Sequence, residues 1–447
     1  MQWPRLIDDT RFGLEDYRDP KHGFARTDFR RDYDRLVFSS PFRRLQNKTQ
    51  VFPLPGSIFV HNRLTHSLEV SSVGKSMADE IAARLRDKYA AMPWADIFYH
   101  LGDIVAAACL AHDLGNPPFG HSGEKAISTF FSEGTGNALR DRFTESEWAD
   151  LTNFEGNANT FRTLTHTFNG RREGGFAMTY SMLASIVKYP YQSTLAGSKG
   201  KFGFFTAETD DFLKVFNRLG IMRLDSPEGT IRYARHPLVY IVEAADDICY
   251  EVMDLEDAHK LKILSTDEVI GTLLRYFDDD ETRKARVLRT MGRIADPNEK
   301  ISYLRSCVIG KLVDCCADTF VANEDDILAA RFDGSLLDNI APAQRDAYCK
   351  SADLSWNKIY CAPDVVDVEL AGNRIVTFLM DKLIGAVVNP ELNYSRLLLS
   401  RVPTQYDTAS ATLYGRVLAV LDHLSAMTDV YALDLYRKLN GTSLPAV

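Results

Sequence analysis

Apolar residues recur every three to four positions through most of the chain, which is the period of an amphipathic helix. The clearest case is residues 62–89, where the spacing is kept by Leu68, Val70, Val73, Met77, Ile81 and Leu85. Asn62 and Thr65 are both suitable N-cap residues for this segment. We therefore predict a helix of several turns that carries His66 in its first turn and Arg63 just before it.

The same period continues along the rest of the chain. We predict helices at 97–114, 122–131, 152–168, 177–188, 212–219 and 238–258, and a mostly helical remainder that is clearest at 308–320, 366–388, 412–427 and 431–439. Residues 1–45 read as an irregular charged arm that leads into a short helix, and residues 190–206 read as a loop or flap. Alternating apolar residues on both sides of Pro55-Gly56 predict a small β-hairpin within 46–60.

These patterns predict an all-α fold with a small β-hairpin and a helical C-terminal elaboration. We divide the chain into an N-terminal arm and hairpin (1–60), a helical core (61–260) and a helical C-terminal region packed on that core (261–447). No repeat and no convincing linker separates these parts.

The composition is that of an ordinary globular protein, with 45% hydrophobic and 25% charged residues among 447. The net charge of −9 excludes a bulk positive field that would attract polyanions. An anionic substrate must therefore meet a local basic pocket.

Cysteine usage and the chain start bear on the compartment. The seven cysteines form no Cys-x-x-Cys pair, and the first residues are polar and charged rather than apolar. No apolar run approaches the roughly 20 residues that span a bilayer. We expect a cytoplasmic protein with no membrane partner.

The stretch Ala106–Glu124 concentrates the candidate chemistry. It opens as an apolar helix and ends with the adjacent pair His112-Asp113. Gly115 and Pro117-Pro118 then interrupt the helix, and the chain continues to a second histidine and a glutamate, His121 and Glu124. A single buried histidine is more often structural, so a functional role for His112-Asp113 depends on further candidate residues elsewhere in the chain.

Four side chains from three predicted helices form a candidate metal site: His66, His112, Asp113 and Asp246. Two imidazoles and two carboxylates favour Mn, Fe, Mg, Ni or Co over a thiolate zinc site. Asp246 read alone could be a helix-surface acid, but its flanks are apolar, and a carboxylate among apolar residues is rarely buried without a partner.

Several longer strings resemble a known family. They are RRLQNKTQVFPL, RLTHSLEV, AHDLGNPPFGHSGE, NFEGNA, KYPY, EAADDICY and MTDVYALDLYRKLNG. Their histidines and aspartates follow the H…HD…D pattern of the HD-domain phosphohydrolases. The strings together resemble the deoxyguanosine triphosphate triphosphohydrolase (dGTPase) family over nearly the whole chain. That family is itself similar to the vertebrate dNTP triphosphohydrolase that carries a SAM domain.

The resemblance implies metal-dependent hydrolysis of dGTP, and of other dNTPs in many relatives, to a deoxynucleoside and inorganic triphosphate, with control of dNTP pools as the consequence. It implies Mn²⁺ or Mg²⁺, with Co²⁺, Fe²⁺ or Ni²⁺ as alternatives, bound by the four residues above. His121 and Glu124 are the implied catalytic pair, and their spacing of three places them on one helix face. His121 is either the acid toward O5′ or part of a dyad that activates water.

The resemblance also implies the substrate contacts. Tyr250 would pack under the deoxyribose, Asp254 would accept from its 3′-hydroxyl, and Gln50 would lie near the 3′ side. The implied phosphate contacts are Arg63, Lys188, Tyr189 and Asn116. The vertebrate relative has a lysine directly after its metal-binding aspartate, whereas this chain has Asp247, so that role does not carry over.

The sequence leaves base recognition and assembly open. Arg43, Arg44, Asn47 and residues 390–405 are candidates for the base, but no spacing selects among them. By family analogy we expect a homo-oligomer, a hexamer or tetramer, and a nucleotide effector or single-stranded DNA as a further partner. The alternatives are an HD phosphohydrolase of cyclic nucleotides or (p)ppGpp, and a non-catalytic nucleotide sensor.

Overall fold

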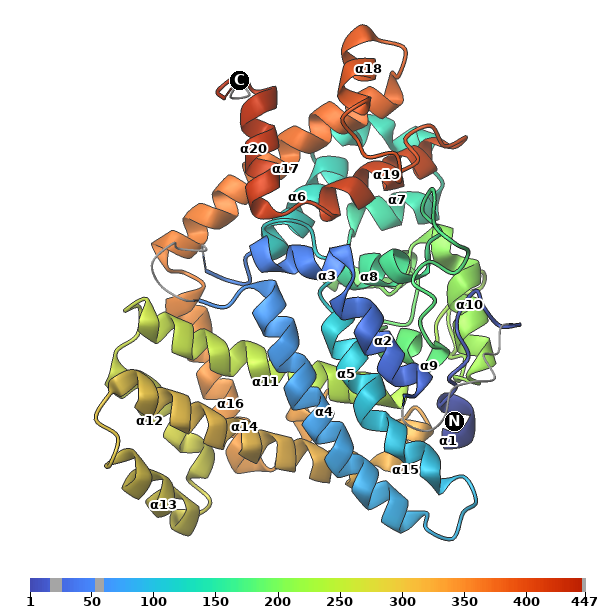
Figure 1. Ribbon diagram of the computed structural model, residues 1–447. Coiled ribbons are helices and arrows are strands. Elements are labelled where there is room, and N and C mark those ends of the chain that lie inside the picture. Colours follow the sequence, from blue (N-terminus) through green and yellow to red (C-terminus); the bar gives the residue numbers. More distant parts are fainter. Residues whose placement is uncertain (17–25, 53–59, 444–447) are drawn as a thin grey trace.

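The computed structural model describes residues 1–16, 26–52 and 60–443. Within these residues the fold is all-α, as predicted (Figure 1), and the only strand-like pairings are isolated bridges. The turn of the predicted hairpin, Pro55-Gly56, lies outside the described residues. Its described flanks meet at a single antiparallel bridge between Thr49 and Asn62.

Three helices form the centre of the molecule. They are α4 (Arg63–Lys88), α5 (Leu101–Ala111) and α11 (Pro237–Lys260). Helices α4 and α5 lie side by side, and α11 packs against both. All the predicted apolar positions of α4 are buried except Leu68, which faces outward.

The N-terminal arm is more regular than predicted. It forms α1 (Trp3–Leu6), α2 (Asp28–Val37) and α3 (Ser40–Arg44). Thr27 and Ser39 cap the last two helices by accepting from backbone amides. Trp3 and Leu6 are fully buried, so the arm begins inside the core.

The predicted helix 152–168 is reduced to Gly156–Thr165, and two further predicted helices are also shorter in the structure. The first, 97–114, consists of a 3₁₀ segment, Ala95–His100, and then α5. Helix α5 ends at Ala111 because Thr160 ties the residues after it to another helix, donating to the His112 carbonyl and accepting from the Gly115 amide. The second, 177–188, is reduced to Tyr180–Ser185 because Ala177 has a left-handed φ of 50° and Thr179 caps the helix start.

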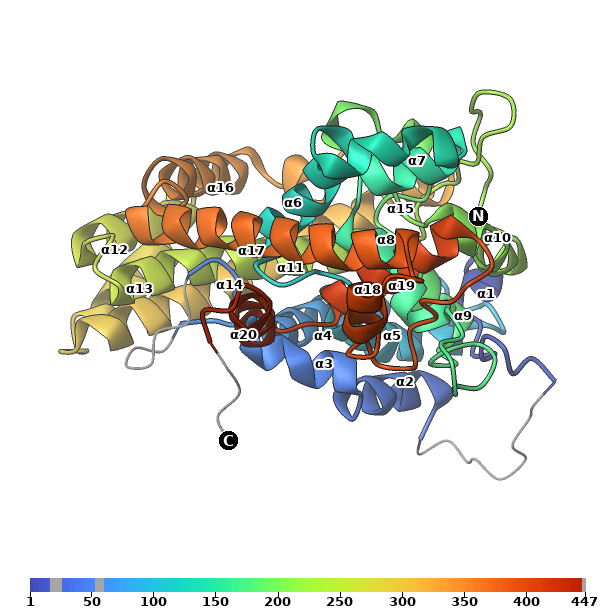
Figure 2. The same cartoon turned by 90° about the horizontal axis from the view of Figure 1, so that it is seen from above.

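The remaining helices surround this centre. They are α6 (Gly120–Ser132), α7 (Glu145–Thr152), α8 (Gly156–Thr165), α9 (Tyr180–Ser185), α10 (Thr209–Arg218), α12 (Thr266–Leu274), α13 (Glu281–Met291), α14 (Pro297–Ala322), α15 (Glu324–Leu328), α16 (Pro342–Leu354), α17 (Pro363–Val388), α18 (Asn393–Leu399), α19 (Leu413–Ser425) and α20 (Asp429–Leu439). Figure 2 shows α17 running across the molecule, with α19 and α20 beside it.

The buried apolar side chains form two clusters. The main cluster is built around α4, α5, α9, α11 and α14. The second cluster contains the inner faces of α6, α17, α19 and α20. Among the described helices, none combines the length and hydropathy that crossing a lipid bilayer requires. The division into an arm, a core and a C-terminal region stays a prediction.

Candidate metal centre and adjoining cavity

The start of α4 fixes two of the candidate side chains. Asn62 caps the helix, and its side-chain oxygen accepts from the amides of Leu64 and Thr65 at 3.1 and 3.0 Å. The Thr65 hydroxyl in turn accepts from the Asn62 amide at 3.1 Å, which completes a capping box. Arg63 and His66 therefore lie in the capped first turn of a long helix.

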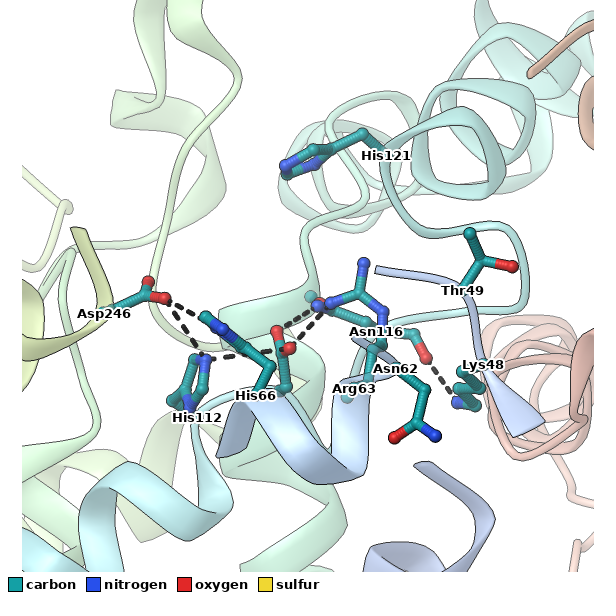
Figure 3. A network of polar contacts seen from close by, with 12 residues as sticks. Lys48, Thr49, Asn62, Arg63, His66, His112, Asn116, His121 and Asp246 are labelled. Atoms are coloured by element: carbon teal, nitrogen blue, oxygen red, sulfur yellow. Dashed lines mark hydrogen bonds and ion pairs between the residues drawn. The ribbon is translucent and has the colours of Figure 1, made fainter. Parts of the chain in front are cut away.

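Three of the four predicted metal ligands converge (Figure 3). Ligand atoms of His66, His112 and Asp246 all lie within 4.8 Å of one another. Oδ1 of Asp246 is 3.0 Å from Nε2 of His66 and 3.5 Å from Nε2 of His112. The side chains come from α4, the end of α5 and the middle of α11, as the sequence predicts.

Asp113 lies beside this trio and contacts other groups as well. Its Oδ2 is 3.7 Å from Nε2 of His112 and 2.8 Å from a guanidinium nitrogen of Arg63, and its Oδ1 accepts from Asn116. The Arg63 guanidinium thus connects the first turn of α4 to the end of α5.

The chemistry of these groups fits a divalent cation. Nδ1 of His112 lies 2.6 Å from the Cys109 carbonyl, so in the neutral ring it donates there and Nε2, 3.5 Å from Asp246, is the nitrogen that can bind a metal. This Nε2 is buried and has no hydrogen-bond partner among the described residues. Mixed imidazole and carboxylate ligands are typical of first-row metals.

Electrostatics at the cluster point the same way. Burial lowers the pKa of His112, but Asp113 and Asp246 outweigh it and raise the pKa to about 9. Burial raises the pKa of Asp246, but His112 and His66 hold it well below its usual value. The negative potential that retains a proton on His112 would equally favour a metal ion.

A cavity of about 300 Å³ adjoins the cluster. Most of the predicted site residues line it. The lining consists of Gln50, Arg63, His112, Asp113, Asn116, His121, Glu124, Glu155, Asn157, Lys188, Tyr189, Lys201, Asp246, Asp247 and Tyr250. His66 is buried behind this surface at 2% exposure and reaches it through Asp246.

His121 and Glu124 enter the cavity from α6, which begins after a left-handed turn. Phe119 and Gly120 have φ of 62° and 55°, and a β-carbon at Gly120 would lie 2.5 Å from the Arg63 guanidinium. Nδ1 of His121 is 3.1 Å from Oε2 of Glu124, whose Oε1 accepts from the Gly156 amide at 2.9 Å. Glu124 raises the pKa of His121 through this hydrogen bond and its charge.

Two lysines line the cavity, each beside a carboxylate. Lys188 lies 3.3 Å from Glu243, and Lys201 lies 2.7 Å from Glu155 and 4.0 Å from Glu124. The Tyr189 ring follows Lys188 on the same wall. The cavity lining thus places three cationic side chains, Arg63, Lys188 and Lys201, among five carboxylates.

Four lining residues were missing from the predicted set: Glu155, Asn157, Lys201 and Asp247. Glu155 and Asn157 belong to the NFEGNA string, where Glu155 caps α8 by accepting from the amides of residues 157 and 158. Lys201 lies in the loop 190–206, which has no periodicity to place it. Burial raises the pKa of Asp247 to about 7, and the nearby Lys188 opposes that shift.

The proposed sugar residues are only partly on the cavity surface. Tyr250 lines the cavity, and its ring centroid is 6.0 Å from that of Tyr360. Asp254 lies one turn further along α11, is buried, and accepts from the Tyr360 hydroxyl at 2.8 Å. Oε1 of Gln50 is buried without a hydrogen-bond partner in the part of the chain that the structure describes.

The base-recognition candidates do not reach this cavity. Arg43, Arg44, Asn47 and residues 390–405 are absent from its lining among the described residues. Arg44 instead donates to the Ala426 carbonyl at 3.1 Å. The structure therefore does not bring these candidates to the metal cluster.

Comparisons with known proteins agree with this geometry. The HD domain model matches residues 63–151. The chain is 37% identical to a deoxyguanosinetriphosphate triphosphohydrolase-like protein of Synechocystis sp., covering 99% of this chain and 100% of the relative. It is 34% identical to a protein of the same name from Pseudomonas aeruginosa over the full length of both. It is also 31% identical to the deoxyguanosinetriphosphate triphosphohydrolase of Yersinia enterocolitica, covering 92% of this chain and 93% of the relative.

Proposed function

Because the chain belongs to the dGTPase family of HD-domain phosphohydrolases, we propose that it hydrolyses dGTP, and other dNTPs, to a deoxynucleoside and inorganic triphosphate. In this reaction a water oxygen forms a bond to the α-phosphorus and the bond from that phosphorus to O5′ breaks. The leaving O5′ takes up a proton. The convergence of a His/Asp cluster with a cavity that Arg63, Lys188 and Lys201 also line carries the proposal.

His66, His112, Asp113 and Asp246 would hold a divalent metal, with Mn²⁺ or Mg²⁺ as the first candidates. Such an ion supplies Lewis-acid activation of water and neutralises phosphate charge. The buried Nε2 of His112 and the adjacent carboxylate oxygens support this assignment. Arg63 neutralises Asp113 on its other side and keeps that carboxylate oriented.

His121 would hold the proton that O5′ receives. Its hydrogen bond to Glu124 keeps the imidazolium form populated above the ordinary histidine pKa, which suits a general acid near neutral pH. Glu124 is fixed in turn by the Gly156 amide, so the ring of His121 is oriented from behind.

The cationic wall suits a triphosphate. We assign phosphate binding to Arg63, Lys188 and Tyr189, with Asn116 beside them, and add Lys201 because it lines the same wall. The guanidinium of Arg63 can bind phosphate oxygens bidentately, and the lysines act as point charges. Together they offset the negative charge of Asp246 and Asp247.

Tyr250 would lie against the deoxyribose, one helical turn from Asp246 on α11. A ring at that position leaves little space for a 2′-hydroxyl, which supports selection of deoxyribonucleotides. Asp254 would accept from the 3′-hydroxyl while Tyr360 donates to it. The guanine preference rests on the names of the relatives.

Substrate profiling of the purified protein tests the proposal. The protein is incubated with each of the four dNTPs, with GTP, with a cyclic nucleotide and with ppGpp, in the presence of Mn²⁺, Mg²⁺ or Co²⁺. We expect equal amounts of deoxynucleoside and inorganic triphosphate from dGTP, and none after chelation. Release of monophosphate or pyrophosphate, or turnover of the cyclic nucleotide or ppGpp alone, would assign the site to another nucleotide class.

The Asp246→Ala variant tests the metal assignment separately. Loss of its carboxylate removes one ligand of the cluster, so we expect both bound metal and triphosphate release to disappear. Metal analysis by mass spectrometry and the release assay give two independent measurements. Asp381→Ala, an exposed aspartate on α17 that pairs with Lys382, is the matched control.

A further inference from the structure

The turn 116–119, which links the metal-cluster helix α5 to the His121 helix α6, is held from behind by two distant side chains. Nζ of Lys48 donates to the carbonyl of Asn116 at 2.6 Å (Figure 3). It also donates to the carbonyl of Ser425 at 2.6 Å. Oδ1 of Asp429 accepts from the Phe119 amide at 2.9 Å. Both ends of the turn are therefore tied to the junction between α19 and α20.

Asp429 also holds the segment that carries Lys48. Its Oδ2 accepts from the amide of Thr49 at 2.7 Å and from the Thr49 hydroxyl at 2.6 Å. We call Lys48, Thr49 and Asp429 the clasp. Lys48 is 2% exposed and the other two are 8% exposed, so these hydrogen bonds form away from water, where the loss of one partner is costly.

The clasp acts on a strained residue. Phe119 is not a glycine, yet it has a left-handed φ of 62°, and its own side chain does not cap α6. Such a conformation persists only where the surroundings impose it. Besides Asp429, the close approach of α17 restrains it, because a β-carbon at Gly372 would lie 2.6 Å from the Phe119 side chain.

His121 lies two residues beyond Phe119, in the first turn of α6, whereas the metal cluster lies on α4, α5 and α11. The inner face of α6 belongs to the second hydrophobic cluster and the other three helices to the main one. The position of His121 relative to the metal cluster therefore depends on how the turn between them is fixed.

We propose that Asp429 is a positioning residue for His121, which it places through the Phe119 amide, and that Lys48 fixes the other end of the same turn. The inference rests on the proposed function, because it assigns His121 a part in turnover. Asp429 is itself absent from the metal cluster and from the cavity lining, so it reaches the reaction through the two segments that it holds, the turn 116–119 and Thr49.

A double-mutant cycle with full-length protein tests this proposal. We expect Asp429→Ala to lower kcat for dGTP by about 100-fold, the size of effect that a displacement of about 1 Å produces, with KM and metal affinity within about twofold of wild type. Asp429→Asn keeps one acceptor oxygen and should lose less. In a His121→Ala background, Asp429→Ala should lower the residual rate by less than about twofold, because its route of action is already gone.

Controls separate positioning from general stability. Asp434→Ala removes an exposed aspartate of the same helix, paired only with Lys438 among the described residues, and should leave kcat unchanged. Metal binding, measured by calorimetry, and thermal unfolding confirm that each variant is folded. If Asp429→Ala does not fold, Lys48→Met removes the other contact to the turn and should show the same dependence on His121.

Equal losses of kcat in the wild-type and His121→Ala backgrounds would overturn the inference, and so would a loss that appears in KM or metal affinity instead. Full activity of His121→Ala would instead remove His121 from the proposed mechanism, and this inference would fall with it. If His121→Ala loses activity as expected while Asp429→Ala keeps full activity, only the positioning role of Asp429 is overturned.

Discussion

The hydrogen bond between His121 and Glu124 decides over which pH range the imidazole is protonated. Glu124 raises the pKa of His121, so the acid form survives to a higher pH than in a free histidine. For a general acid, the rate falls as the pH rises through this pKa. For a base in a water-activating dyad, the rate falls as the pH drops through it.

The Glu124→Gln variant distinguishes these two roles. It removes the charge that raises the pKa of His121, so the pKa returns toward its ordinary value. If His121 is the acid, the alkaline limb of the kcat/KM profile moves to lower pH. If His121 is the base, the acidic limb moves to lower pH instead. Glu133→Gln, at the exposed end of α6, should leave both limbs in place.

Tyr250 is the residue that we expect to exclude ribonucleotides. Replacing its ring by a methyl group opens space beside Asp246, where the 2′-hydroxyl of GTP would lie. Tyr250→Ala should therefore raise kcat/KM for GTP relative to dGTP by about tenfold, the order of discrimination that a steric pocket provides. Competition between the two nucleotides measures the ratio. An unchanged ratio would contradict the packing role.

At the scale of elements, α11 begins at a histidine that must stay neutral. Nδ1 of His236 caps the helix by accepting from the Leu238 amide at 3.2 Å, and its Nε2 lies 3.2 Å from the Leu6 carbonyl. The ring is fully buried, and burial lowers its pKa from 6.5 to about 4. The cap thus joins the helix that carries Asp246 to the N-terminal arm.

This cap predicts a pH-dependent stability. Below pH 6.5 the unfolded chain binds a proton at His236 that the folded chain refuses until about pH 4, so stability falls as the pH drops through this window. The free energy of unfolding should decrease by about 2 kcal/mol between about pH 7.5 and about pH 5 from this group. His236→Asn retains a capping oxygen and should show a correspondingly smaller decrease in denaturant midpoints. An equal decrease in both proteins would contradict this account.

The helices that could be predicted from the sequence are those whose apolar periodicity and capping residues lie close together along the chain. The helix at 62–89 was predicted, with Asn62 as one of two candidate caps, because periodicity and capping depend on residues close together in the sequence. The shortened 177–188 segment was not, since a left-handed Ala177 leaves no trace in a pattern of apolar positions. The same limit applied to Lys201, which an irregular loop without apolar periodicity brings to Glu155 and Glu124.

At the scale of the whole molecule, one buried arginine joins α8 to α19. The guanidinium of Arg162 donates to Asp422 at 2.9 and 2.8 Å and also pairs with Glu208. All three side chains are buried, and burial opposes the charge of Arg162 while Asp422 and Glu208 restore it and raise its pKa. These ion pairs hold α19 against α8, and α19 in turn contacts the clasp through the Ser425 carbonyl.

The Asp422→Asn variant tests the contribution of this group. Removing one partner leaves a buried guanidinium undercompensated, which typically costs about 3 kcal/mol of unfolding free energy. Chemical denaturation compares it with Asp381→Asn, whose aspartate is exposed and which should match wild type. A midpoint equal to that control would mean that Glu208 alone satisfies the arginine.

Contacts of this range explain why the sequence indicated the candidate metal ligands but not the residues that support them. His66, His112 and Asp246 each lie in a short sequence motif that can be recognised within a single helix. Lys48 and Ser425 are 377 residues apart, and no spacing in either segment indicates that they meet. The family resemblance covered both segments as strings, yet it carried no information about the hydrogen bonds between them.

Gly120, directly before His121, affects the electrostatics of the candidate metal centre. At Gly120 the room that any side chain would fill is occupied by the guanidinium of Arg63, the same group that neutralises Asp113. A methyl group added at Gly120 would therefore change the local electrostatics, because it would push the Arg63 guanidinium away from the Asp113 carboxylate. The absence of a side chain at Gly120 thus helps to set the electrostatic potential at the candidate metal centre.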